Sequence, residues 1–271
     1  MRTGVFLPNS VPGTTGQQLL DWATTAERRG FDSLGVIDRV VYDSYEPLVA
    51  LSLAAAVTER VELVTNVLIS PLRNGGILAK QADSLDRASG GRLTLGLGVG
   101  LREDDFARCE VDIHVRGALL DENMRQLAGR RVLIGGEAQH AGRRLMTGGD
   151  GWTMMIGSPD QFAAGITEVR NRWADAGRAG SPRGMAVMYA ALGDDAERLA
   201  ADAVTSYYAW LGPEICAAIV AGVATTPDAV RGYLAAFEAA GADDVLICPC
   251  SSDITQLELL ADAALRTPAL V

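Results

Sequence analysis

The sequence is short of the residues that most catalytic and metal sites use. Two histidines and four cysteines occur in 271 residues, and no cysteines are spaced as CxxC. Two histidines are too few for a multi-histidine metal site and leave little basis for Ser-His-Asp catalysis. Neither a disulfide framework nor a metal site is expected. Cys248 and Cys250 flank a proline directly after the apolar run 245–247, and we interpret them as thiols at a strand end rather than as a redox pair.

Basic residues are few, and lysine is nearly absent. The chain carries 24 Lys and Arg, of which only Lys80 is lysine, against 34 Asp and Glu, for a net charge of −10. No cluster of basic residues is available to follow a phosphate backbone, so nucleic acid is not expected as a partner. Apolar runs such as 48–57 fall far below the ~20 residues of a membrane span, and strand-like residues begin at Gly4 without room for a signal peptide. These absences predict a soluble, cytoplasmic protein.

Short apolar runs typical of buried strands recur along the chain. Residues 61–69 are almost continuously apolar and β-branched, as a strand covered on both faces requires. Eight strands are predicted: Gly4–Leu7, Ser33–Ile37, Val61–Ile69, Leu93–Gly98, Val132–Ile134, Gly151–Ile156, Met185–Ala191 and Asp244–Cys248.

Helical periodicity fills the intervals between these strands. Eight helices are predicted: Thr15–Arg29, Pro47–Thr58, Ile77–Ser89, Gly117–Leu127, Ala138–Thr147, Pro159–Ala176, Asp195–Trp210 and Pro227–Ala240. Capping hydroxyls precede a proline at two of the starts, at Ser158 and Thr226. Because strand and helix alternate without a break in composition, we predict a single (β/α)8 TIM barrel over residues 1–271.

In such a barrel, ligand-binding groups follow the C-terminal ends of the strands. The glycines of residues 96–100 have GxGxG spacing, and the charged segment 102–105 follows instead of a helix start, so they do not indicate a dinucleotide fingerprint. They instead allow a flat ligand to lie against the backbone. Gly135 and Gly136 either present N–H groups to a phosphate or acidic tail, or form an ordinary tight turn.

Asp38 and Arg39 end the second predicted strand with opposite charges. Asp38 is either a functional carboxylate or one half of a salt bridge to Arg73 or a neighbour. Tyr42 and Tyr45 follow, and they either wall a pocket or pack the loop down. With few acid–base residues and many glycines at strand ends, the sequence indicates that a bound cofactor supplies the chemistry.

Four blocks of the sequence, in the same order, resemble the luciferase-like monooxygenase superfamily of flavin- or deazaflavin-dependent barrel oxidoreductases. The blocks are residues 26–39, 58–100, 132–152 and 226–249. The resemblance implies FMN or coenzyme F420 as the cofactor, and hydride transfer or oxygen insertion on a small-molecule substrate. Because the family is often dimeric, it also implies a homodimer.

The resemblance further implies a site at the barrel mouth. By position, Asp38 approaches the edge of the cofactor ring as the catalytic residue, and the resemblance allows a non-proline cis peptide bond near Asn66 and Val67. The residues that it assigns to the ring, the ribityl or phosphate side and the pocket border are Asn66, Val67, Gly98, Gly100, Gly135, Gly136, Glu137 and Trp152.

Three departures from the family pattern concern catalysis. Arg39 stands where many relatives carry histidine, and Leu101 stands where many carry tryptophan. About four residues separate Leu127 from Val132, where relatives usually carry a long excursion, so the barrel is expected to be shortened and to lack a substrate-covering element. The alternative hypothesis is therefore a degenerate, non-catalytic flavin-binding barrel that acts as a partner subunit.

Overall fold

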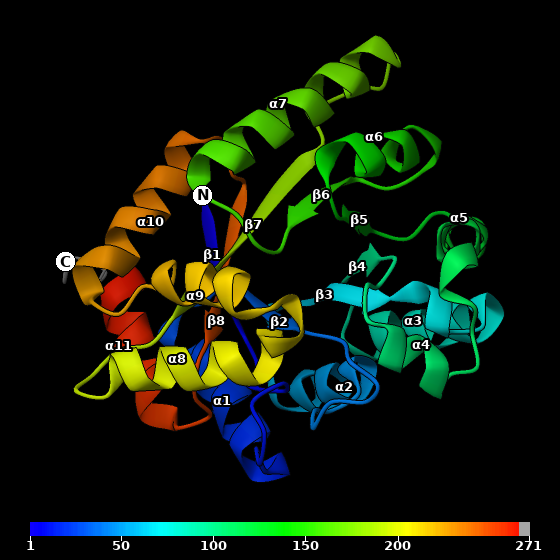
Figure 1. The fold of residues 1–271 in the computed structure, drawn as a ribbon. Coiled ribbons are helices and arrows are strands. Elements are labelled where there is room, and N and C mark those ends of the chain that lie inside the picture. Colours follow the sequence, from blue (N-terminus) through cyan, green and yellow to red (C-terminus); the bar gives the residue numbers. More distant parts are fainter. Residues whose placement is uncertain (266–271) are drawn as a thin grey trace.

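A computed structural model describes residues 1–265, which form a closed barrel of eight parallel strands (Figure 1). The strands are β1 Arg2–Phe6, β2 Ser33–Val36, β3 Glu62–Ile69, β4 Leu93–Gly98, β5 Val132–Gly135, β6 Gly151–Met154, β7 Arg183–Ala190 and β8 Asp244–Pro249. Each strand pairs with the next along the chain, and β1 pairs with β8 to close the ring. The predicted (β/α)8 fold and its eight strands are confirmed.

Helices surround the barrel (Figure 1). They are α1 Gly16–Arg29, α2 Pro47–Val57, α3 Gly75–Ala88, α4 Glu103–Arg108, α5 Arg116–Gln126, α6 Ala138–Thr147, α7 Pro159–Asp175, α8 Ala196–Tyr208, α9 Pro213–Ala221, α10 Pro227–Ala239 and α11 Ile254–Ala264. Short 3-10 turns occupy η1 Ser70–Leu72, η2 Ile113–Val115 and η3 Ala209–Leu211. Capping boxes begin α1 at Thr15 and α7 at Ser158, which satisfies backbone N–H groups that a helix start leaves free.

Three of these helices, α4, α9 and α11, are additions to the predicted set. The expectation that no helix follows residues 96–100 is wrong, because α4 begins at Glu103 inside the charged segment. Its first turn contains Glu103, Asp104 and Asp105, whose negative charges are favourable at the positive end of a helix dipole.

The barrel interior is filled by side chains. Phe6, Val64, Leu133, Met185 and Leu246 are each 1% exposed or less and form one cluster inside the ring. A larger apolar layer lies between the strands and the surrounding helices. The interior is therefore a packed core rather than a channel, which leaves the two ends of the barrel as the places for function.

The N-terminal end of the barrel is closed by a charge network. Arg183 begins β7, and its guanidinium contacts Glu62 at 2.7 Å and Asp244 at 2.6 Å, at the starts of β3 and β8. Arg2 of β1 reaches the same two carboxylates at 3.0 and 2.8 Å. Opposite charges satisfy one another here, which is typical of a structural end.

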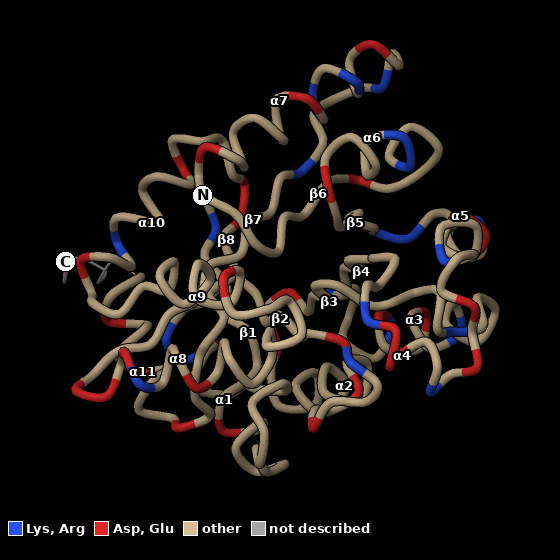
Figure 2. The backbone as a smooth tube through the Cα atoms, viewed as in Figure 1, with Lys and Arg blue, Asp and Glu red and all other residues tan. Residues whose placement is uncertain are grey.

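The connection from α5 to β5 is short, as predicted, and spans residues 127–131. Over residues 1–265, acidic and basic residues are interspersed, without a basic stripe (Figure 2). Within residues 1–265, no helix is both long and apolar enough to cross a membrane.

Candidate functional site

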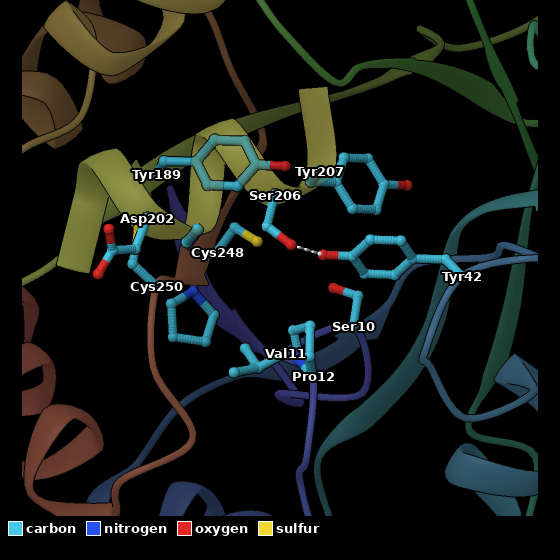
Figure 3. Close-up of a pocket in the computed structure, with 12 residues that line it drawn as sticks. Ser10, Val11, Pro12, Tyr42, Tyr189, Asp202, Ser206, Tyr207, Cys248 and Cys250 are labelled. Carbon is cyan, nitrogen blue, oxygen red and sulfur yellow. Dashed lines mark hydrogen bonds between the residues drawn. The ribbon is translucent and has the colours of Figure 1, made fainter. Parts of the chain in front are cut away.

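A cavity of about 230 Å³ lies at the C-terminal end of the barrel (Figure 3). Its walls come from the β1–α1 loop at residues 10–12, from Tyr42, from Tyr189 of β7, from α8 and from residues 248–250. Helix α8 contributes Tyr207, whose ring also packs against the cluster that fills the barrel interior. The cavity is therefore bounded by α8 on one side and by strand ends on the other.

Tyr42, Tyr189 and Tyr207 line this cavity, and Tyr208 contacts the last two of them. Tyr42 and Tyr207 lie edge to face with ring centroids 5.2 Å apart, and Tyr207 lies 4.8 Å from Tyr208. The hydroxyls of Tyr189 and Tyr208 are 2.7 Å apart, and the Tyr42 hydroxyl lies 2.6 Å from Oγ of Ser206 (Figure 3). Burial raises the pKa values of Tyr189, Tyr207 and Tyr208, so these phenols stay protonated at neutral pH.

The thiols at the end of β8 also line the cavity. Cys248 and Cys250 are buried, and all four cysteines are free. Burial raises the pKa of Cys250 to about 12 and moves that of Cys248 in the same direction. Because the thiolate is the reactive form, these protonated thiols act as apolar wall, in agreement with the interpretation of 248–250 as a strand end.

Asp38 is held in a buried ion pair. Its carboxylate accepts two hydrogen bonds from Arg73, at 2.6 and 3.1 Å, and one from the backbone N–H of Ile69 at 2.7 Å. Burial raises the pKa of Asp38, while Arg73 and the Ile69 N–H act in the opposite direction. Of the two interpretations of Asp38, the structure shows the salt bridge to Arg73, and its catalytic role stays a prediction.

Arg39 points into a different environment. Its side chain is 4% exposed, and its Nε donates to Asp105 at 2.6 Å. Asp105 also accepts the backbone N–H groups of Val40 and Val41. The guanidinium carbon of Arg39 lies 5.4 Å from the ring centroid of Tyr42 and 5.5 Å from that of Tyr207.

The predicted ring-facing residues lie on the opposite side of the mouth, at the ends of β3 to β5. A non-proline cis peptide bond joins Asn66 and Val67, at the position that the sequence resemblance allowed. Asn66 is fully buried, and its side chain contacts Thr153 and Met185 in the barrel. Val67 is half-buried at a register shift in β3.

The glycines beside Val67 make room for its side chain. A Cβ at Gly98 would lie 2.5 Å from one Val67 methyl, and a Cβ at Gly135 would lie 2.8 Å from the other. Gly100 has φ +75° and closes the turn against Ile69. The Val67 side chain thus fills the space beside Gly98 and Gly135, and the contacts of these glycines with a cofactor stay predictions.

The segment after β5 is open. Gly136 and Glu137 are exposed, and no heavy atom lies within 4 Å of the position that a Cβ on Gly136 would take. Trp152 is 2% exposed and stacks on Phe162 of α7, so its ring packs in the layer outside the barrel, while its Nε1 donates to the Gly136 carbonyl at 2.7 Å. The predicted contact between Trp152 and a cofactor stays untested.

Sequence reasoning missed Ser206, Tyr207 and Asp105 as site residues. The signal for Tyr207 was an adjacent tyrosine pair in a chain with six tyrosines. No pattern linked Asp105 to Arg39, because the contact is formed only when the barrel closes.

Residues 1–147 match the family model described as luciferase-like monooxygenase. The chain belongs to the luciferase-like monooxygenase family. This family member shares its fold with the monooxygenase RslO1 from Streptomyces bottropensis, at TM-score 0.81 and 19% identity over 98% of this chain and 99% of that chain. An F420-dependent secondary alcohol dehydrogenase superposes with a TM-score of 0.83 at 16% identity. The match covers 98% of this chain and 99% of the dehydrogenase. At these identities, the likeness supports the fold.

Sequence relatives of this luciferase-like monooxygenase family member align over shorter stretches. A protein from Mycobacterium tuberculosis (strain ATCC 25618 / H37Rv) is 38% identical over 96 residues, which cover 35% of this chain and 27% of that protein. The 5,10-methylenetetrahydromethanopterin reductase of Methanolobus tindarius is 34% identical over 90 residues, covering 33% of this chain and 27% of the reductase. The matched stretches thus span about a quarter of these relatives.

Proposed function

We propose that this chain is a flavin- or deazaflavin-dependent oxidoreductase that acts by hydride transfer or oxygen insertion on a small organic substrate. The observation that carries the proposal is the family match over residues 1–147, on a closed barrel with a cavity at its mouth. Among the structural neighbours, the F420-dependent secondary alcohol dehydrogenase supports coenzyme F420, and the monooxygenase RslO1 supports oxygen insertion. The proposal therefore keeps both FMN and F420.

The β3–β5 side of the mouth fits the flat ring of such a cofactor. Val67 presents an apolar side chain that is seated on Gly98 and Gly135, and the exposed Gly136 leaves space beyond it. When bound there, the cofactor supplies the hydride or oxygen chemistry. The Val67 side chain would face the ring, and Gly136 with the start of α6 would adjoin the acidic tail.

The tyrosine-walled cavity fits the substrate. Its volume of about 230 Å³ lies below the roughly 300–1,000 Å³ of sites for drug-sized ligands, which argues for a small molecule and against the cofactor ring as its occupant. Its lining is mostly aromatic and apolar, with hydroxyls at Ser10, Tyr42 and Ser206. The substrate would then lie between α8 and the strand ends.

Asp38, predicted as the catalytic carboxylate, is fully engaged by Arg73 and the backbone of Ile69. The geometry favours a positioning role, in which Asp38 holds the end of β3 and with it the peptide bond between Asn66 and Val67. Its substitution is expected to act on cofactor affinity through this strand end.

A second candidate, a non-catalytic flavin-binding partner subunit, is favoured by one observation. Burial raises the pKa values of Tyr189, Tyr207, Cys248 and Cys250 in the cavity, and the lining within residues 1–265 contains no histidine. Asp202, at the cavity wall, is exposed. The cavity therefore holds little general acid–base capacity.

Cofactor binding is tested by titrating the protein separately with FMN and with F420 and following cofactor absorbance and fluorescence. We expect saturable binding of one of them. Val67→Ala should weaken it by up to about tenfold, since two methyl groups that the ring covers fully would contribute about 1.6 kcal/mol. Val49→Ala, at a position 54% exposed on α2, is the matched control. Saturable binding of neither cofactor contradicts the proposal.

Turnover separates the two candidates. The loaded protein is incubated with reductant and a panel of small alcohols, ketones and aromatic compounds, and reductant consumption is measured. Substrate-dependent consumption supports the enzyme, whereas cofactor binding without consumption across the panel supports the partner subunit.

We also propose a cytoplasmic homodimer. Exposed apolar side chains on α2 and α3 support self-association, with Val49 54% and Ile77 60% exposed. Light scattering on the purified protein measures the mass directly. A monomer at micromolar concentration would contradict the homodimer.

A further inference from the structure

Arg39 is a buried cation with unused hydrogen-bond donors. Its side chain is 4% exposed, and within residues 1–265 neither Nη1 nor Nη2 has an acceptor. The Asp104 carboxylate lies 3.6 Å from Nη2, which is too long for a hydrogen bond, and pairs with Arg102 instead. Because buried charged donors without partners are costly, these two nitrogens are places for a further acceptor.

Asp105 fixes the direction of the guanidinium. One Asp105 oxygen accepts Nε of Arg39 at 2.6 Å, and the other accepts the backbone N–H groups of Val40 and Val41 at 2.9 and 2.8 Å. Asp105 is fully buried and leaves the Nη1–Nη2 edge free. Two parallel N–H donors on that edge match the two oxygens of a carboxylate.

The free guanidinium adjoins the cavity through two tyrosine rings. Tyr42 and Tyr207 both contact Arg39, and both line the cavity. They come from segments far apart in the sequence, the β2–α2 loop and α8. Figure 3 shows the hydrogen bond between the hydroxyls of Tyr42 and Ser206, which joins these segments. The same two rings thus contact both the Arg39 guanidinium and the cavity.

We propose that Arg39 binds the carboxylate of a small substrate whose remaining body is apolar. The body occupies the tyrosine-walled cavity, and the carboxylate pairs end-on with Nη1 and Nη2 once the rings of Tyr42 and Tyr207 part. The assignment rests on the proposed function in that the ligand is the substrate of the oxidoreductase. Arg39 thus has a binding role at the position where the family resemblance implied histidine.

Calorimetric titration without cofactor tests this assignment, with benzoate and its neutral analogue benzamide as probes. We expect saturable benzoate binding and at least tenfold weaker binding of benzamide. Arg39→Met should weaken benzoate at least tenfold and leave benzamide unchanged. Arg198→Met, which removes an exposed arginine of α8, is the matched control and should bind benzoate like the wild type.

Two further variants guard against misfolding, because Arg39→Met leaves Asp105 buried beside a neutral side chain. Arg39→Lys keeps the charge but lacks the planar fork, and should weaken benzoate less than methionine does. The double variant Arg39→Met with Asp105→Asn removes both charges and should bind benzoate as weakly as Arg39→Met.

Equal binding of benzoate and benzamide, or no saturable benzoate binding, would overturn the assignment. A further contrary result is that folded Arg39 variants keep their benzoate affinity and lose affinity for FMN or F420. That result would assign Arg39 to cofactor binding and would overturn the carboxylate assignment. The benzoate titration contains no cofactor, so a negative result there says nothing against the binding of FMN or F420. Failure of cofactor binding alone would equally leave the benzoate result standing.

Discussion

Asp38 is a buried charge that is held chiefly by one charged partner. Asp38 is 3% exposed, and Arg73 donates one hydrogen bond to each of its carboxylate oxygens. Glu46 adds a second acidic partner for Arg73 at 3.0 Å. A buried pair of this kind contributes less to net stability than its removal costs, because loss of one member leaves the other charge without a partner.

Asp38→Ala should therefore lower the free energy of unfolding by about 3–5 kcal/mol, since the more exposed Glu46 is then the remaining carboxylate partner of Arg73. Urea denaturation followed by circular dichroism measures the change. The exposed pair of Asp228 and Arg231 provides the control, and Asp228→Ala should cost about 0–1 kcal/mol. A loss below 1 kcal/mol for Asp38→Ala would contradict the structural role.

Strand starts at the N-terminal end of the barrel share one charge network. Burial acts to raise the pKa of Glu62, but the hydrogen bonds and charge of Arg183, with Thr94 and Arg2, outweigh it, and the pKa falls below its ordinary value of 4.5. The ionised carboxylate thus joins β3, β7 and β1. The network ties together strands that are distant in the sequence.

This network should make stability depend on pH. A lowered folded pKa means that the contribution of Glu62 is complete above its unfolded pKa and is lost as the pH falls through the folded value. Glu62→Gln should cost about 1.5–3 kcal/mol at pH 7, and the difference from the wild type should shrink below about pH 4. Denaturation curves between pH 3 and 7 test this, and a constant difference would contradict it.

The α8–α9 segment, residues 196–221, is attached to the rest of the mouth by side chains. Tyr42 bonds Ser206, and Arg102 lies 5.2 Å from the ring centroid of Trp210. Tyr42→Phe combined with Trp210→Ala should increase amide exchange in residues 196–221 and leave the barrel strands unchanged. Hydrogen exchange with mass spectrometry resolves the segment, and Tyr233→Phe on α10 is the control.

Sequence patterns predicted all the strands and missed three helices, of which α4 and α9 lack a buried apolar stripe whereas α11 has one. All eight strands were predicted because each is buried on both faces, as in β4, where every residue is buried. Helix α4 has six residues, and α9 buries only Cys216, so neither shows a helical apolar stripe.

The site was predicted less completely than the fold. The cis peptide bond at Asn66 and Val67 lies where the family resemblance allowed one. The contact of Arg39 with Asp105 spans 66 residues and that of Tyr42 with Ser206 spans 164. Such contacts depend on ring closure and on the path of α8, and neither leaves a local pattern in the sequence.

The molecule as a whole presents a mouth with two sides. Val67 and the glycines around it form the β3–β5 side, and the tyrosine cavity forms the other, next to β7 and β8. Arg39 and Asp105 lie against the tyrosines of the cavity. In the proposed function, the cofactor lies on the β3–β5 side and the substrate lies in the tyrosine cavity. Both are at the C-terminal end of the packed barrel.

Cofactor binding should stabilise the entire barrel. A ligand at 100 times its dissociation constant adds about 2.7 kcal/mol when it binds only the folded state. For a chain of this size, each kcal/mol added to the free energy of unfolding raises the Tm by about 2–4 °C. The Tm should therefore rise by roughly 5–10 °C. Differential scanning calorimetry with FMN and with F420 measures the shift, and no shift with either at that saturation would contradict binding to the native barrel.

The placement of Trp210 gives the protein a built-in optical reporter. The other three tryptophans, Trp22, Trp152 and Trp173, are at most 6% exposed, whereas Trp210 is 42% exposed beside Arg102. An aqueous quencher such as acrylamide therefore reaches Trp210 first, and its emission lies furthest to the red. A ligand that shifts α8 would change this component alone, so opening of the mouth can be followed by fluorescence without any label.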